Sequence, residues 1–172
     1  MTFSIRIIKV ILLIGIVYSK TSDDRGYIVE VGDMAPDFAM EYTTGEKVKL
    51  SELRGQVVVL QFTASWCSVC REEMPHLEKD VWQAFKDKGV LLIGIDRDEP
   101  LETVIKFQKD MKTTYPLALD PGANIFGLFA AKEAGVTRNI VIDRDGKIVF
   151  LTRLFEKREY QEMIGVIERL LI

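Results

Sequence analysis

Cysteine, histidine and long apolar runs are all scarce in this chain of 172 residues, and each scarcity excludes a class of protein. One histidine and two cysteines supply too few soft ligands for a four-coordinate structural zinc site. Because Cys67 and Cys70 are three positions apart, a bridge between them would close a tiny loop and constrain the unfolded chain little. The pair is therefore better explained by chemistry than by a disulfide scaffold.

Charge is equally unremarkable, with a formal net value of −3. Such a chain offers no concentrated basic face for nucleic acid. Hydrophobic residues make up 48% of the sequence and charged residues 28%, and both lie in periodic segments rather than low-complexity tracts. We find no internal repeat and no long flexible linker. The composition predicts one globular domain.

Residues 1–19 differ from the rest of the chain. Arg6 and Lys9 precede an apolar run over residues 10–17, and small or modest side chains follow at residues 17–19. A charged start, a short apolar centre and a cleavage-like end predict a signal peptide, and hence a periplasmic or exported protein. The alternatives are a retained membrane anchor, although a spanning helix needs about 20 apolar residues, and an ordinary buried helix.

The remainder of the chain alternates between strand-like and helix-like segments. Apolar runs predict strands at residues 57–62, 90–95 and 116–119, and stripes with helical spacing predict helices at 71–88, 101–111, 124–131 and 160–171. Hairpins are expected at residues 38–50 and 140–150. This order predicts an α/β domain over residues 31–172, with a central mixed β-sheet flanked by helices, an N-terminal β-hairpin and an α/β insert.

The chemistry-bearing motif is Trp66-Cys67-Ser68-Val69-Cys70, which directly follows a predicted buried strand and opens a predicted helix. At a helix N-terminus, free N–H groups and the helix dipole favour a thiolate at Cys67. Cys70 follows about one turn later, close enough to attack a mixed disulfide formed by Cys67. The spacing predicts Cys67 as the nucleophile and Cys70 as the resolving cysteine of a redox-active dithiol.

Three sequence stretches resemble the thioredoxin superfamily, and within it the exported TlpA/ResA-like branch related to alkyl hydroperoxide reductase and thiol-specific antioxidant. They are the run from Leu60 to Cys70, the following Glu73-Met74-Pro75, and a Gly-x-x-Ala-Pro-x-Phe pattern at residues 32–38. The resemblance implies a thioredoxin-like fold and thiol–disulfide oxidoreductase activity without cofactor or metal. It also implies protein disulfide substrates, a membrane-embedded electron donor and, as one role, cytochrome c maturation.

The sequence departs from the family pattern at three places. Thr137 stands where the family has a cis-proline facing the dithiol, and the buried acid of thioredoxins is replaced by Gln61. The resemblance then assigns the proton-accepting role to Glu99, in the loop after the next strand, although such acids are often merely solvated. The central dipeptide Ser68-Val69 is also unusual. Trp66, Ser68, Val69 and Thr137 are the predicted substrate-binding residues, with plain packing or a plain loop position as the alternative for Trp66 and Thr137.

Two other functions compete with disulfide exchange. A thiol peroxidase would fit the alkyl hydroperoxide reductase-like pattern, but Ala64 stands where a peroxidatic Thr-x-x-Cys motif needs threonine. A non-enzymatic module, either redox-inert or carrying copper, would have lost the cysteines or spaced them more widely. His76 lies in the predicted helix away from the sulfurs, and we interpret it as a surface histidine.

Overall fold

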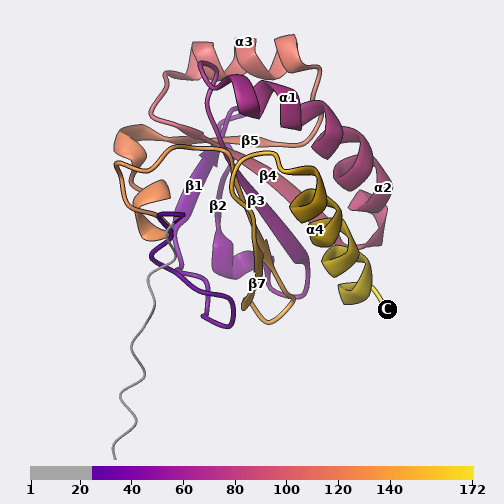
Figure 1. Cartoon of the computed structure of the whole chain (residues 1–172). Coiled ribbons are helices and arrows are strands. Elements are labelled where there is room, and N and C mark those ends of the chain that lie inside the picture. Colours follow the sequence, from indigo (N-terminus) through magenta and orange to yellow (C-terminus); the bar gives the residue numbers. More distant parts are fainter. Residues whose placement is uncertain (1–24) are drawn as a thin grey trace, which may run out of the picture.

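The computed structural model describes residues 25–172 (Figure 1). A mixed sheet of seven strands crosses the molecule in the order β2-β1-β5-β4-β3-β6-β7. The strands are β1 Ala39–Tyr42, β2 Lys47–Lys49, β3 Val57–Thr63, β4 Val90–Arg97, β5 Leu117–Asp120, β6 Arg138–Ile142 and β7 Ile148–Leu151. Strands β3, β4 and β5 are parallel neighbours, and the other pairs are antiparallel. The predicted mixed sheet and both predicted hairpins are confirmed.

Strand β3 lies in the interior of the sheet, and its sequence is apolar except for Gln61 and Thr63. All seven of its residues are buried, as expected for a strand covered on both faces. Its parallel register with β4 pairs Val57 with Val90 and Thr63 with Asp96. Both strands therefore deliver their carboxyl ends to the same edge of the sheet, where the cysteine motif begins.

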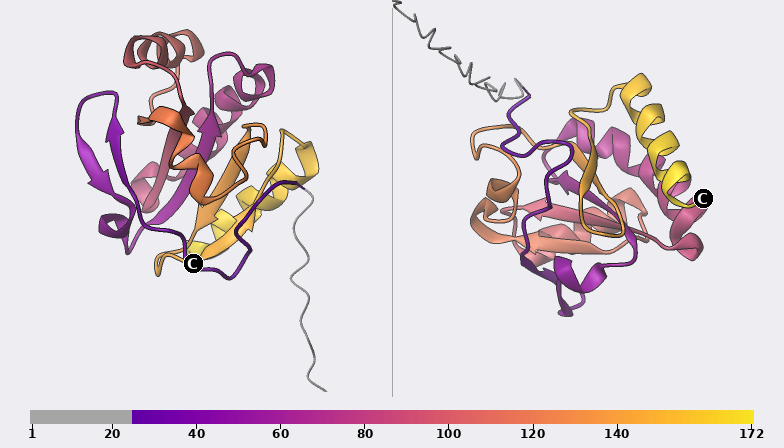
Figure 2. Two further views of the ribbon diagram at one scale, coloured as in Figure 1. Left: turned by 90° about the vertical axis from the view of Figure 1, so that its left-hand side faces the viewer. Right: turned by 90° about the horizontal axis from the view of Figure 1, so that it is seen from below.

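The two faces of the sheet are covered differently. One face packs against α1 (Ser68–His76), α3 (Leu101–Met111) and α4 (Lys157–Leu170), through side chains such as Met74, Phe107 and Met163. The other packs against the lead-in segment after Arg25 and the segment that follows β5. Figure 2 shows α4 and the segment that follows β5, drawn in orange, on opposite sides of the sheet.

The helix predicted over residues 71–88 is present but is neither continuous nor correctly bounded. It begins earlier, at Ser68, and after His76 it widens into a π-helical stretch, Leu77–Trp82, before the short α2 (Gln83–Phe85) and a 3-10 turn, Lys86–Lys88. Pro75 inside α1 has no N–H to donate. A proline inside a helix interrupts its hydrogen-bond ladder, and here the helical winding changes two residues after it.

The helix predicted over residues 124–131 is wrong. Two 3-10 turns stand there, Pro121–Ala123 and Phe126–Leu128. The Asp120 carboxylate accepts the N–H groups of Ile125 and Phe126 at 2.7 and 2.8 Å, and Ala130 pairs with Tyr27 of the lead-in segment. The bridge to the lead-in segment directs the N–H of Ala131 to the Gly26 carbonyl at 3.0 Å, so the ladder that the apolar spacing predicted does not form.

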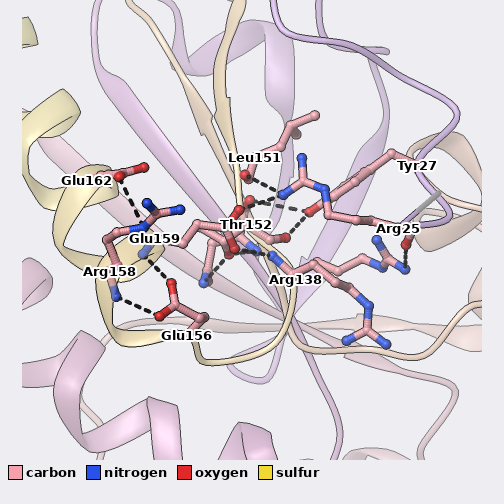
Figure 3. Close-up of polar contacts among 11 residues, drawn as sticks. Arg25, Tyr27, Arg138, Leu151, Thr152, Glu156, Arg158, Glu159 and Glu162 are labelled. Carbon is pink, nitrogen blue, oxygen red and sulfur yellow. Dashed lines mark hydrogen bonds and ion pairs between the residues drawn. The ribbon is translucent and has the colours of Figure 1, made fainter. Parts of the chain in front are cut away.

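The lead-in segment is fastened to the end of β7 and the start of α4 (Figure 3). Arg25 forms an ion pair with Glu159 at 2.6 Å, and the Tyr27 hydroxyl donates to the carbonyl of Thr152 at 2.5 Å. The buried Arg138 donates to the carbonyl of Arg25 at 2.5 Å and stacks over the Tyr27 ring, 4.5 Å from its centroid. We call these contacts the N-terminal clasp.

The predicted signal peptide or anchor, residues 1–19, lies outside the described residues. Within residues 25–172, every helix is too short or too polar to cross a bilayer.

Candidate active site

The two cysteines meet at the junction between β3 and α1. Cys67 is the N-cap of α1, and its sulfur accepts the backbone N–H of Cys70 at 3.1 Å. The two side chains form a disulfide, with their Cα atoms 5.3 Å apart. Cys67 is half-buried whereas Cys70 is fully buried. The asymmetry leaves Cys67 as the sulfur that a substrate can approach.

Thr137 lies against both sulfurs. Its hydroxyl oxygen is 3.0 Å from the Cys67 sulfur and 2.9 Å from the Cys70 sulfur. The residue is buried, and no peptide bond in residues 25–172 is cis. The structure thus brings Thr137 to the place predicted from the family pattern, but its side-chain hydroxyl faces the sulfurs.

The other predicted substrate-binding residues surround Cys67. Ser68 is exposed and Val69 half-buried, both in the first turn of α1. The Trp66 side chain is 64% exposed, so packing into the core does not explain its presence. An exposed indole beside an accessible sulfur is free to contact a substrate.

Glu99, the predicted proton acceptor, is attached to the loop that leads into the motif. Its carboxylate accepts the backbone N–H of Ser65 at 2.5 Å and the Ser65 hydroxyl at 2.6 Å. It lies close to the buried Asp96, whose pKa is raised to about 8 by burial and, secondarily, by the charge of Glu99. Glu99 thus holds the backbone two residues before Cys67.

Glu73 is the acidic residue that the sequence interpretation missed. It follows Cys70 by three positions in α1, so the two side chains share one helix face, and only 1% of Glu73 is exposed. Its two carboxylate oxygens accept the side-chain amides of Asn139, at 2.6 Å, and Gln61, at 3.2 Å. The i, i+3 spacing from Cys70 was the available signal, but the two amide partners come from β6 and β3.

Burial raises the pKa of Glu73 to about 7, and the amides of Asn139 and Gln61 oppose that rise by stabilising the carboxylate. Gln61 is itself oriented by the Tyr115 hydroxyl, which donates to its side-chain oxygen at 2.8 Å. A carboxyl group with a pKa near neutrality, one helical turn from a buried thiol, can take up and return a proton.

His76 is exposed, as interpreted from the sequence. Its ring lies 5.0 Å from the Phe155 ring, centroid to centroid, and its Nδ1 is 3.8 Å from the Asp80 carboxylate. Within residues 25–172, no three metal-ligating side chains gather closely enough to hold an ion.

A Cys-x-x-Cys pair that caps the helix after the central strand of a mixed sheet defines a thioredoxin-fold disulfide protein. Residues 31–151 match the AhpC/TSA family, and the chain therefore belongs to that family. The relatives below establish it as a thiol–disulfide oxidoreductase of the ResA type.

Curated relatives and solved structures agree on this chemistry. The thiol-disulfide oxidoreductase ResA of Bacillus cereus is 30% identical over 142 residues, which cover 83% of this chain and 79% of that protein. A candidate protein disulfide isomerase from Bacteroides thetaiotaomicron is 58% identical, with a TM-score of 0.82 over 85% of this chain and 92% of that one. A candidate thiol:disulfide interchange protein DsbE from Chlorobium tepidum is 31% identical, with a TM-score of 0.72 over 84% and 99% of the two chains.

Proposed function

We propose that this protein is an exported reductant of protein disulfides, with Cys67 as the attacking thiol and Cys70 as the resolving thiol. The observation that carries the proposal is the difference in burial between the two sulfurs, together with the buried Glu73 three positions after Cys70 in α1. A substrate reaches Cys67 at the helix N-terminus, where a thiolate is favoured. Cys70 is shielded until an intramolecular attack is needed.

The reaction proceeds in two exchanges. The Cys67 thiolate attacks one sulfur of the substrate disulfide, which forms a mixed disulfide and releases one substrate thiolate. Cys70 then gives its proton to the Glu73 carboxylate and attacks the Cys67 sulfur, which releases the second substrate sulfur as a thiolate. Two electrons pass to the substrate, and the Cys67–Cys70 disulfide remains. A donor dithiol reverses these steps and restores the reduced enzyme.

The location and the electron source follow from the predicted signal peptide at residues 1–19. An exported dithiol works in an oxidising compartment, where it needs a dedicated source of electrons, and a membrane-embedded donor supplies one. Reduction of haem-ligating cysteines during cytochrome c maturation is one such task. Protease added to intact spheroplasts should digest the full-length protein; full protection of the protein in spheroplasts would contradict export.

Cysteine variants test the chemistry. Cys67→Ala should abolish insulin disulfide reduction, and Cys70→Ala should accumulate mixed disulfides that survive non-reducing gel electrophoresis. His76→Ala, which changes an exposed side chain on the same helix, serves as the control. A titration of the Cys67–Cys70 pair against glutathione buffers then shows whether the pair reduces or oxidises its substrates. Unchanged activity in Cys67→Ala with no trapped partner would contradict the assigned order of attack.

Thiol peroxidase activity is the second candidate, because the Thr137 hydroxyl lies beside both sulfurs in a protein of the AhpC/TSA family. The buried Ala64 carries no hydroxyl to orient a peroxide. Stopped-flow mixing of the reduced protein with hydrogen peroxide measures the direct rate. Consumption of peroxide faster than reduction of a disulfide substrate would favour the peroxidase.

A further inference from the structure

The most unusual contact at the disulfide is made by the side chain of Thr137. The Thr137 hydroxyl touches both sulfurs, at 3.0 and 2.9 Å, and only 1% of the residue is exposed. A hydroxyl is both a donor and an acceptor. It is therefore the one group in the described site that can hydrogen-bond to the two cysteines at once.

The backbone at Thr137 is held in an unfavourable conformation. Its φ is +67°, in the left-handed region that a β-branched residue rarely adopts. Its N–H donates to the Phe62 carbonyl at 3.1 Å, and its carbonyl accepts the Leu154 N–H at 2.9 Å. These two bonds hold the residue in place from β3 and from the segment between β7 and α4, and strain maintained in this way accompanies functional positions.

The same bonds limit what Thr137 offers to a substrate. Because its N–H is already used by Phe62 and the residue is buried, it is poorly placed to pair with an incoming strand. What remains directed at the redox centre is the hydroxyl.

We propose that Thr137 is a positioning residue whose hydroxyl links the two thiols of the reduced enzyme, accepting from the Cys70 S–H and donating to the Cys67 thiolate. The proposal rests on the order of attack given above. In the disulfide, the hydroxyl faces two neutral sulfurs, which are weak acceptors. After reduction it faces a thiolate, and hydrogen bonds to charged acceptors are roughly twice as strong as neutral ones.

The consequence is a preference for the reduced form. Reduction of the Cys67–Cys70 disulfide adds two electrons and, when Cys67 stays a thiolate, one proton, which resides on Cys70. The Thr137 hydroxyl stabilises this product more than the disulfide. Its removal should therefore make Cys67 a weaker acid and the disulfide harder to reduce.

The test uses two variants that both lack the hydroxyl but differ in their effect on the side-chain shape and on the backbone. Thr137→Val keeps the side-chain shape, whereas Thr137→Gly relieves the left-handed backbone and so remains foldable if valine does not. Thr137→Ser retains the hydroxyl. Thr113→Val is the matched control, because Thr113 is also buried and its hydroxyl has no partner among the described residues.

Two readouts separate positioning from folding. The midpoint of the pH–rate profile for iodoacetamide alkylation of Cys67 should rise by about one pH unit in both hydroxyl-free variants. The glutathione ratio at half reduction should shift about tenfold towards stronger reducing conditions, which equals about 30 mV. Thr137→Ser and Thr113→Val should match the wild type in both measurements.

The other possible results contradict either the role of Thr137 or the order of attack. If Cys67 is the reactive thiol but neither hydroxyl-free variant shifts its profile, Thr137 does not position the thiolate. The proposal also fails if serine behaves as glycine does. If alkylation falls on Cys70 instead, the order of attack under the proposed function is wrong, whatever Thr137 does.

Discussion

Two buried carboxyl groups, Glu73 in α1 and Asp96 in β4, differ in the hydrogen bonds that they receive. Glu73, in α1, has a hydrogen-bond donor on each oxygen. Asp96, near the end of β4, is fully buried; within residues 25–172 no amide or hydroxyl donates to its oxygens, and the carboxyl group of Glu99 is its side-chain hydrogen-bond neighbour. Burial raises both pKa values, to about 7 for Glu73 and about 8 for Asp96.

The difference shows how the surroundings of a buried carboxyl group determine its pKa. The Gln61 and Asn139 amides stabilise the charged form of Glu73, so its pKa stays near neutrality although the group is almost fully buried. Asp96 has no such support and faces the charge of Glu99. At neutral pH, Glu73 therefore exchanges its proton readily, whereas Asp96 stays largely protonated. The first acid suits catalysis, and the second is a pH-dependent element of stability.

The sharpest test of the comparison is Glu73→Gln. Loss of the proton acceptor should slow the resolution of the mixed disulfide by about 100-fold, the lower range for a positioned acid–base group. Single-turnover stopped flow with a fluorescent disulfide substrate measures this step from pH 6 to 8. Glu72→Gln, an exposed neighbour, is the control. A loss of less than threefold would remove Glu73 from the mechanism.

Asp96→Asn should have the largest effect on stability. The folded-state pKa of about 8 lies above the ordinary value of 3.8, so the folded protein keeps a proton that the unfolded chain releases. Stability from Asp96 is thus present at low pH and is lost as the pH rises towards 8. The variant should flatten the pH dependence of unfolding free energy between pH 5 and 8 by about 2 to 4 kcal/mol.

Urea unfolding at the two pH values measures this change, with the exposed Asp87→Asn as control. An unaltered pH dependence in Asp96→Asn would mean that Asp96 is ionised in the folded protein.

Gln61→Met should make the pKa of Glu73 more like that of Asp96. Removing one of the two amide donors leaves burial less opposed, so the pKa of Glu73 should rise by about one unit. The midpoint of the pH profile for the resolving step should shift upward accordingly. Gln56→Met, at an exposed position, should leave the profile in place; an identical shift in both variants would refute a specific role for Gln61.

The smallest expected effect comes from Glu99→Gln. Removing the like charge lowers the pKa of Asp96, although burial still raises it. The stability loss between pH 5 and 8 should shrink by about 1 kcal/mol, a smaller change than in Asp96→Asn. The same urea measurements apply, and an effect as large as that of Asp96→Asn would make the charge of Glu99, rather than burial, the main cause.

Prediction from sequence succeeded where local pattern and tertiary packing agree. The β-branched run of β3 and the cysteine motif indicate a buried strand followed by a helix N-terminus, and the structure has both. It failed over residues 124–131, because Gly26 and Ile28 of the lead-in segment bind the N–H of Ala131 and the carbonyl of Phe129, which draws this backbone out of a helical ladder. No local pattern contains those partners.

The same reasoning separates the missed acid, Glu73, from the predicted one, Glu99. Glu73 reads as one more polar residue on an amphipathic helix, and its burial depends on Gln61 and Asn139, which are 12 and 66 residues away in sequence. Glu99 was chosen by resemblance, and the structure ties it to Ser65; its proton-accepting role stays a prediction. Thr137 was found because the family pattern marks its position.

The N-terminal clasp has a mechanical consequence. Arg138, which holds the carbonyl of Arg25, directly follows Thr137, so tension applied ahead of Arg25 would be transmitted along a few covalent bonds to the hydroxyl between the two sulfurs. The C-terminal end of α4 is fastened differently, since Ile172 is fully exposed and lies at the free end of that helix (Figure 1). A surface-immobilised or force-probed version of this enzyme should therefore be attached through its C-terminus, which leaves the redox centre unloaded.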